Sequence, residues 1–190
     1  MHKLNNHWTL WIHYPYDNNW GINSYKKITN FSTLEDGIIL IENINKELIE
    51  KSMMFFMKEN IKPLWEDSNN INGGFISYKL NIDNVYIYFK KLVYNIITNN
   101  IIDDEKICKN INGISISPKK HFCIIKIWLA DFDYINNIIS NNKEDNKEDN
   151  KEDNKEDNKE DNIFSYDIFN IDKMYDIENP ICLLKKHNCI

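Results

Sequence analysis

Hydrophobic and polar positions alternate with two different periods along the chain, and these periods predict strands and helices. In segment 74–80 every second residue is apolar (Ile76, Tyr78, Leu80), which is the period of two that a strand requires. Segment 8–14 (WTLWIHY) is rich in the aromatic and β-branched residues that strands favour. Strands are expected at 8–14, 25–31, 52–58, 74–80, 111–117, 122–129 and 163–169.

Two segments show the apolar spacing of a helix. Ser32, followed three residues later by Glu35, forms a capping box ahead of the apolar residues Ile38, Ile41 and Ile44. Asp83 is expected to cap a second helix, in which apolar residues recur every three or four positions. Together with the strands, these segments predict an α+β fold, a meandering antiparallel sheet with helices on one face.

One segment contains no hydrophobic residue. Residues 142–162 repeat Asn-Lys-Glu-Asp five times and end on Asn162. No apolar surface offsets the entropy of ordering such a segment, so we expect a disordered insertion. A single charged helix is the alternative, which Asn and Asp at every turn oppose. We expect one domain, with its main part in 1–141, the insertion in 142–162, and a C-terminal strand and tail in 163–190.

The net charge of −6 argues at first against a nucleic-acid partner, because phosphate binding usually leaves a basic surface. The repeat carries five Lys and ten acidic residues, a net charge of −5, so the rest of the chain has a net charge of only −1. Every basic residue is Lys, and Asn, Ile and Lys make up nearly half of the chain. These residues share A/T-rich codons, which a cellular parasite or a large DNA virus would both explain. The bias weakens arguments from single Lys residues and strengthens arguments from Trp and Gly.

Several protein classes lack support in the sequence. No apolar run reaches the roughly 20 residues of a membrane span, and no signal peptide is evident. The four cysteines show neither CxxC pairing nor zinc spacing, so we expect reduced thiols in a cytoplasmic protein. No nucleophile, phosphate-loop or metalloprotease motif is present, so no catalytic residue, metal or cofactor is expected. The five histidines are expected at the surface or at strand edges: His2, His7, His13, His121 and His187.

Two tryptophans lie in polar loops. Trp20 follows Asn18 and Asn19, and Trp65 is followed directly by Glu66. A loop tryptophan commonly folds back onto the protein, but two exposed indoles beside a carboxylate can sandwich a flat base and accept its N–H donors. Stacking contributes about 1–3 kcal/mol per base, and a cationic ring adds about 2 kcal/mol when desolvated. The pattern therefore indicates a site for a positively charged, hydrogen-donating purine.

Longer motifs around all five tryptophans resemble the eukaryotic translation initiation factor 4E family, whose members hold the 7-methylguanosine cap of mRNA. The resemblance covers about 1–129 and rests on HKLNNHWTLW (2–11), Trp20, ITNFSTLED (28–36), IKPLWED (61–67) with Asn70 and Gly73-Gly74, Gly113, and Ile127-Trp128. It implies a curved antiparallel sheet with helices packed on its convex face and cap-binding loops on the concave side.

The resemblance also implies roles for individual residues in binding the cap base. Trp20 and Trp65 would enclose the methylated guanine, and the backbone N–H of Trp65 would donate to the guanine oxygen. Glu66 would accept two charge-assisted hydrogen bonds from the guanine edge. Trp128 would lie against the N-methyl group.

The phosphate side departs from the family pattern. Phe75 stands where the family usually has Arg, Lys119 aligns with a second Arg, and Ile124 stands where a Lys usually follows. Lys120 and Lys126 lie close enough in sequence to substitute, although a Lys pair in a turn is ordinarily only solvated. Because Lys offers a point charge rather than a planar fork, we expect altered phosphate contacts and an altered preference for the first transcribed nucleotides.

The face that binds protein partners departs as well. The family binds a helix of the scaffold initiation factor 4G across its convex surface, and here the corresponding Trp is Ile38 and the Leu-Glu pair is Phe89-Lys90. The partner is expected to be a 4G-like scaffold or a divergent replacement. Plain core and surface roles for these helix residues remain an equal alternative. The implied partner-binding residues are His2, Leu34, Ile38, Phe89, Lys90 and Val93.

The expected function is non-enzymatic binding of the mRNA cap in translation initiation. A cap-binding repressor that does not recruit the scaffold is one alternative. A decapping or cap-modifying enzyme is another, and it would need metal-binding carboxylates or a cofactor loop, neither of which the sequence contains.

Overall fold

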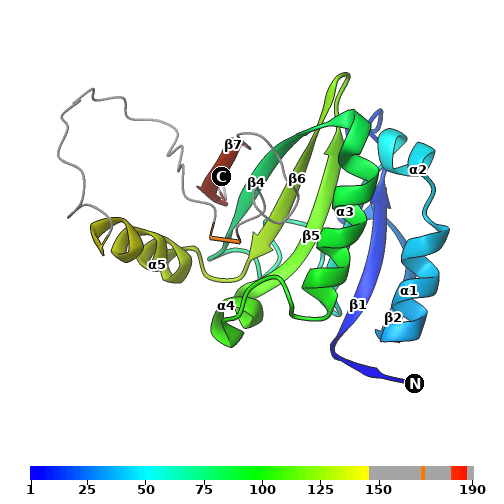
Figure 1. Ribbon diagram of the computed structural model, residues 1–190. Coiled ribbons are helices and arrows are strands. Elements are labelled where there is room, and N and C mark those ends of the chain that lie inside the picture. Colours follow the sequence, from blue (N-terminus) through cyan, green and yellow to red (C-terminus); the bar gives the residue numbers. More distant parts are fainter. Residues whose placement is uncertain (146–167, 170–180, 188–190) are drawn as a thin grey trace.

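The computed structural model describes residues 1–145, 168–169 and 181–187, which form a seven-stranded sheet with helices packed mainly on one face (Figure 1). The strands are β1 (Lys3–His13), β2 (Lys26–Thr33), β3 (Met53–Lys58), β4 (Gly74–Asn81), β5 (Ile111–Pro118), β6 (Phe122–Leu129) and β7 (Ile181–Lys186). The helices are the 3-10 turn η1 (Ile22–Ser24), α1 (Leu34–Asn43), α2 (Lys46–Lys51), α3 (Ile82–Ile97), α4 (Glu105–Asn110) and α5 (Phe132–Asp145). Within these residues, no helix has both the length and the apolar character needed to cross a bilayer.

The strands lie in the order β2-β1-β3-β5-β6-β4-β7, and every neighbouring pair is antiparallel. The predicted α+β class and antiparallel pairing are confirmed. The predicted meander is wrong in one respect, because β4 lies beyond the β5–β6 hairpin rather than next to β3. This crossover places the end of β3 and the start of β4 on opposite sides of the β5–β6 hairpin. The β3–β4 loop therefore spans the hairpin.

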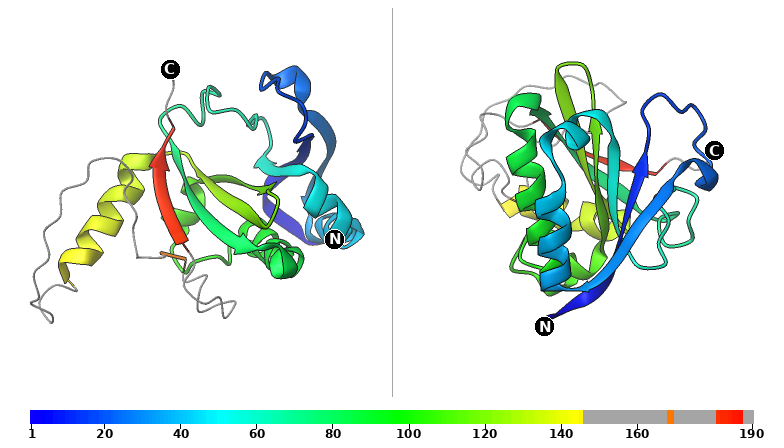
Figure 2. Two further views of the ribbon diagram at one scale, coloured as in Figure 1. Left: turned by 90° about the horizontal axis from the view of Figure 1, so that it is seen from above. Right: turned by 90° about the vertical axis from the view of Figure 1, so that its right-hand side faces the viewer.

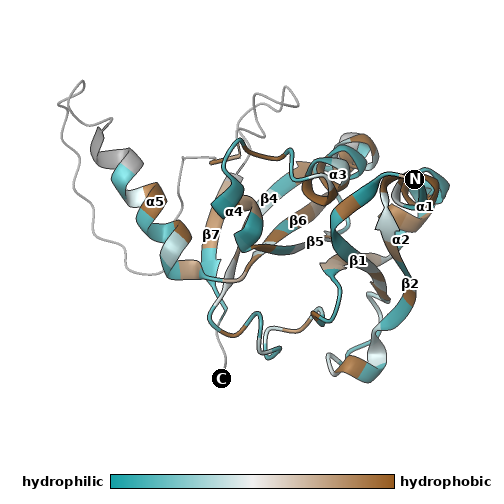
Figure 3. Cartoon of the chain, turned by 90° about the horizontal axis from the view of Figure 1, so that it is seen from below, coloured by the Kyte–Doolittle hydropathy of each residue, from teal (hydrophilic) through white to brown (hydrophobic). Residues whose placement is uncertain are grey.

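Central strands send alternate side chains to two separate clusters. In β3, Met54 and Phe56 pack into the large core on the helix side, while Phe55 and Met57 join a smaller cluster on the opposite face. Figure 2 shows α1 and α3 over one face of the sheet and the β1–β2 and β3–β4 loops projecting from the other. These two loops mix hydrophobic with hydrophilic residues (Figure 3). The period of two predicted in β4 is confirmed by the helix-side core residues Ile76, Tyr78 and Leu80.

Both predicted helices form, but each begins from a different cap residue. The side chain of Thr33, not Ser32, accepts a hydrogen bond from the backbone N–H of Asp36 at 3.2 Å. Likewise the side chain of Asn81 accepts one from the backbone N–H of Asp83 at 3.2 Å, so Asp83 is not the cap. In both cases the preceding strand extends to the cap residue, so strand pairing decides where the helix starts.

Three helices have no counterpart among the expected elements. Helices α2 and α4 have six residues each, which is too short for helical periodicity to be recognised. Helix α5 continues to Asp145 and therefore contains the first repeat unit, whereas the predicted insertion begins at Asn142. The other repeat units lie outside the described residues. So does most of the strand expected at 163–169, of which Ile168 and Phe169 form a turn, and the C-terminal strand is β7.

Gly73 and Gly74 allow the chain to enter the sheet between two neighbouring backbones. A Cβ at Gly73 would lie 1.9 Å from the carbonyl oxygen of Leu129, and one at Gly74 would lie 2.3 Å from that of Lys185. Both contacts are with backbone, which cannot move aside as a side chain can. Only glycine therefore fits where the β3–β4 loop joins β4.

We expect Gly73→Ala to lower the free energy of unfolding by about 2–3 kcal/mol, because the added methyl group overpacks against the backbone of β6. Urea denaturation measures the change. Gly21→Ala is the matched control: its φ of −72° suits alanine, and the nearest atom to the new Cβ is the side-chain oxygen of Asn19 at 3.1 Å. The control should change stability by about 0.5 kcal/mol or less. Equal stability of the two variants would contradict the close approach at Gly73.

Candidate functional site

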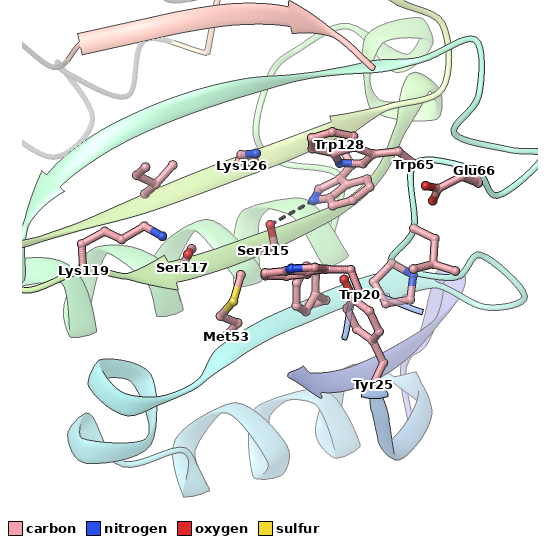
Figure 4. Close-up of a pocket in the computed structure, with 14 residues that line it drawn as sticks. Trp20, Tyr25, Met53, Trp65, Glu66, Ser115, Ser117, Lys119, Lys126 and Trp128 are labelled. Atoms are coloured by element: carbon pink, nitrogen blue, oxygen red, sulfur yellow. Dashed lines mark hydrogen bonds between the residues drawn. The ribbon is translucent and has the colours of Figure 1, made fainter. Parts of the chain in front are cut away.

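A pocket of about 470 Å³ opens on the face of the sheet opposite α1 and α3 (Figure 4). The β1–β2 and β3–β4 loops and the strands β3, β5 and β6 contribute its walls. This volume is typical of a small-molecule site. Six of the seven side chains predicted to bind cap base or phosphate line it: Trp20, Trp65, Glu66, Lys119, Lys126 and Trp128.

Trp20 is held by a histidine at the end of β1. The indole is 53% exposed and stacks on the ring of His13, with 4.5 Å between ring centres and an interplanar angle of 7°. His13 is itself buried, and its Nε2 donates a hydrogen bond to the carbonyl oxygen of Asn19 at 2.9 Å. The ring stack and the hydrogen bond fix both the loop and the indole, so Trp20 presents a ring to the pocket without folding into the core.

The Trp65 loop is organised by two side chains of the motif that follows it. Asn70 is fully buried, and its Nδ2 donates to the carbonyl oxygens of Lys62 at 3.0 Å and Leu64 at 2.7 Å. The carboxylate of Asp67 accepts from the backbone N–H of Lys62 at 3.1 Å. These bonds satisfy loop backbone groups that no strand partner could satisfy. They fix the chain on both sides of Trp65.

A second histidine packs against Trp65, from the C-terminal end of β7. The Trp65 indole is 38% exposed and stacks on His187, with ring centres 5.6 Å apart, and on Phe75, with centres 6.4 Å apart. Neither His187 nor Phe75 lines the pocket, so both contact the indole from outside it. His187 is 5% exposed, and burial, aided by the charge of Lys126, lowers its pKa from 6.5 to about 4. The ring is therefore neutral at physiological pH.

The two supporting histidines depart from the expectation of surface or strand-edge positions. On β1, His13 lies two residues after Trp11, which packs against the cluster that contains Phe55 and Trp128, so the period of two places His13 on the same face as the pocket. The sequence carries this period, but only the structure shows which face holds the pocket. His187 had no such signal, because its role depends on the pairing of β7 with β4 across more than a hundred residues. Neither ring nitrogen of His187 has a hydrogen-bond partner among the described residues.

Trp128 forms part of the pocket floor. It is buried, and its Nε1 donates to the Oγ of Ser115 at 2.9 Å, so the indole N–H is already satisfied. Phe55 packs edge-on against Trp128, with ring centres 6.2 Å apart. What Trp128 offers a ligand is consequently an apolar ring surface. The pocket floor consists of Trp128, Phe55, Ser115 and Tyr25. Of these, the sequence motifs predicted only Trp128.

Glu66 is exposed at the mouth of the pocket. Within the part of the chain that the structure describes, its carboxylate has neither an ion pair nor a hydrogen bond. Its charge nevertheless reaches Tyr25, whose pKa is raised to about 12 by burial and, second, by Glu66. The carboxylate oxygens are therefore available to accept hydrogen bonds from a ligand.

Two of the three predicted phosphate-binding lysines reach the pocket. Lys119 and Lys126 line it, while Lys120 lies in an adjoining cleft. The Nζ of Lys126 lies 3.9 Å from the centre of the Phe75 ring, so Phe75 supports this lysine. Burial lowers the pKa of Lys126 to about 8, and the charges of Lys119 and Lys185 contribute in the same direction. A nearby anion, such as a phosphate, would therefore stabilise the charged form of Lys126.

The predicted partner face needs correction. Phe89 and Val93 are each only 1% exposed because they point into the core, and Lys90 is 8% exposed, with its ammonium group paired to Glu42 at 2.6 Å. These three residues therefore present little surface to a partner. The other three predicted residues lie at or near the surface: His2 bonds to Glu35, Leu34 is half-buried, and Ile38 is 42% exposed.

No group of three potential metal ligands occurs among the residues described above. Of the four cysteines, Cys108 and Cys123 are free and buried, Cys182 is buried on β7, and Cys189 lies outside the described residues.

Comparison with known proteins gives matches to one family. The family model described as eukaryotic initiation factor 4E matches residues 3–160. Eukaryotic translation initiation factor 4E of Candida albicans is 31% identical over 149 residues, which are 70% of this chain and 66% of that protein. The chain thus spans just under two thirds of this relative's length.

Solved structures of initiation factor 4E-3 match as well. The Caenorhabditis elegans protein, in complex with the 4E-binding protein Mextli and a cap analog, has a TM-score of 0.61 and 26% identity, covering 68% of this chain and 75% of that one. The Ascaris suum protein in complex with the m7G cap has a TM-score of 0.60 and 26% identity, covering 68% of this chain and 74% of that one. Because the family match extends over most of the sequence and the sheet is shared with these structures, the chain belongs to the eukaryotic initiation factor 4E family.

Proposed function

We propose that this protein binds the 7-methylguanosine cap of mRNA in the cytoplasm and acts in translation initiation without enzymatic activity. The observation that carries the proposal is the pairing of two partly exposed indoles, Trp20 and Trp65, with the unpaired carboxylate of Glu66 at one pocket. A methylated guanine is flat and cationic, which suits stacking between the two indoles, and its N–H donors suit the carboxylate of Glu66. The Ascaris relative solved with the m7G cap supports the same ligand.

The base is held by three kinds of contact. Trp20 and Trp65 stack on its two faces, and the positive charge of the methylated ring strengthens the attraction to both indoles. Glu66 accepts hydrogen bonds from the guanine edge. Trp128, whose N–H is already bonded to Ser115, supplies an apolar surface for the methyl group. Unmethylated guanine lacks both the charge and the methyl contact, so it binds more weakly.

The phosphates extend from the base toward Lys119. Figure 4 shows Lys119 at the end of the pocket away from Glu66, with Ser117 and Lys126 between them. The triphosphate therefore meets lysines after leaving the indoles, in place of the arginine forks of the family pattern. Its negative charge also stabilises the ammonium form of Lys126, whose pKa is lowered to about 8 without a ligand.

A protein partner binds the helix side of the sheet. The Caenorhabditis elegans relative was solved with a 4E-binding protein, which supports such a partner here. Ile38 and its neighbour Ile39 are exposed on α1 and offer an apolar contact, while His2 lies nearby through its bond to Glu35. Because Phe89, Lys90 and Val93 are buried, the partner is a 4G-like scaffold or a divergent replacement that contacts α1 more than α3.

Retention on 7-methyl-GTP resin tests the base site. We expect free 7-methyl-GTP to release the protein at concentrations at which GTP does not. Trp20→Ala should weaken retention at least about tenfold, because one face of the base loses its stacking partner. Ile39→Ala, which shortens an exposed apolar side chain on α1 at the opposite face of the sheet, is the control and should bind normally. Equal competition by GTP and 7-methyl-GTP would contradict the sandwich.

Incubation with capped RNA checks the non-enzymatic part of the proposal. The RNA should be recovered with its cap intact. Recovery of decapped or further modified product would favour the enzyme alternative instead.

Lys119→Ala should weaken binding of 7-methyl-GTP about tenfold without changing the fold, because one phosphate-facing cation is lost. Isothermal titration gives the affinity, and circular dichroism monitors the fold. Lys27→Ala removes the same charge from an exposed position on β2 and should leave the affinity unchanged. An unaltered affinity in Lys119→Ala would place the phosphates elsewhere.

His187 gives the protein a predictable dependence on pH. Its pKa is about 4 in the folded protein and near 6.5 when unfolded, so only the unfolded state takes up a proton between these values. The contribution of the neutral ring to stability is thus complete above about pH 6.5 and is lost as the pH falls toward 4. We expect Tm to fall more steeply over this window in the wild type than in His187→Phe, which keeps an aromatic ring. Parallel curves would contradict a buried neutral His187.

A further inference from the structure

A second cleft, of about 420 Å³, adjoins the phosphate end of the cap pocket. It lies between the Pro15-Tyr16 turn, the last residues of α2, and the Pro118-Lys119-Lys120 turn between β5 and β6. Lys119 lines both the pocket and this cleft. A chain that leaves the pocket past Lys119 therefore enters the cleft directly.

One wall of the cleft carries an exposed aromatic ring on a rigid support. Tyr16 is 78% exposed, and its ring stacks on Tyr14 with 5.3 Å between centres and an interplanar angle of 12°. Pro15 occupies the second position of a turn closed by the bond from Asp17 N–H to the carbonyl oxygen of Tyr14 at 3.0 Å. Tyr14 is further held by the ammonium group of Lys26, 4.8 Å from its ring centre. The stack leaves one face of Tyr16 open to solvent.

The opposite wall is positively charged. Lys120 has no acidic partner among the described residues, and the backbone N–H of Lys119 donates to the carbonyl oxygen of Phe122 at 2.8 Å, which fixes the turn. At the end of α2, Lys51 pairs with Glu47 and Glu50 with Lys46, so these charges are already balanced within the helix. The uncompensated charge of the cleft is that of the two turn lysines.

We propose that this cleft binds the first transcribed nucleotide of capped RNA, with its base stacked on Tyr16 and its phosphates on Lys119 and Lys120. The proposal rests on the cap-binding function proposed above and adds a subsite to it. An open aromatic face suits any base, because every base has a π surface to stack. Paired lysines beside it suit the phosphates on either side of that nucleotide. Purines stack over a larger area than pyrimidines, so the subsite favours a purine at this position.

Two ligands allow binding at the subsite to be measured apart from binding at the cap pocket. The capped dinucleotide 7-methyl-GpppA carries the first transcribed nucleotide, and 7-methyl-GTP does not. Tyr16→Ala should weaken binding of 7-methyl-GpppA about fivefold or more, while its affinity for 7-methyl-GTP stays within about twofold of the wild type. Tyr16→Phe keeps the ring and should bind both ligands as the wild type does. Isothermal titration measures the affinities of the wild type and both variants for each of the two ligands.

The outcomes distinguish the subsite from the function on which it rests. Equal effects of Tyr16→Ala on both ligands, or no effect on either, would overturn the subsite while leaving cap binding intact. Failure of the wild type to prefer 7-methyl-GTP over GTP would instead overturn the proposed function. Replacing 7-methyl-GpppA by its cytidine counterpart should weaken wild-type binding, and a reversed order would contradict stacking on Tyr16.

Discussion

The binding site depends on the support of two indole rings, each held by a histidine. An unsupported tryptophan in a loop would turn inward to bury its apolar surface, and a sandwich would then have to form as the ligand bound, with a cost in ordering entropy. Here His13 stacks on Trp20, while His187 and Phe75 pack against Trp65. Each indole buries one side on protein and keeps a ring surface at the pocket.

This support is possible because both faces of the sheet are packed. The main core lies between the sheet and the helices α1 and α3. Aromatic residues on the opposite face of the same strands form the floor of the pocket. Gly73 and Gly74 then bring β4 close enough to β6 and β7 for the end of β7 to reach the Trp65 loop. His187 is placed by this pairing, so the C-terminal strand is part of the site rather than an appendage to it.

The sequence predicted the parts of this arrangement that have local signals. Periods of two and of three to four residues identified most strands and the helices α1 and α3, and motif spacing identified Trp20, Trp65 and Glu66, which the structure places at one pocket. Helix starts were misplaced by one or two residues, because cap signatures compete with strand pairing. Phe89 and Lys90 match partner-contacting positions of the family, yet they are buried, since a linear match cannot show which side of a helix faces the core. His187 was beyond prediction, because only long-range pairing gives it a role.

The proposed function requires that a methylated guanine lies between Trp20 and Trp65 with its edge on Glu66. A crystal structure of the protein with 7-methyl-GTP tests it most directly. We expect the base to be stacked between the two indoles, the carboxylate of Glu66 to lie within hydrogen-bond distance of the guanine edge, and His13 and His187 to remain packed against the indoles. A base bound outside the two indoles, or bound between them with Glu66 turned away, would contradict it.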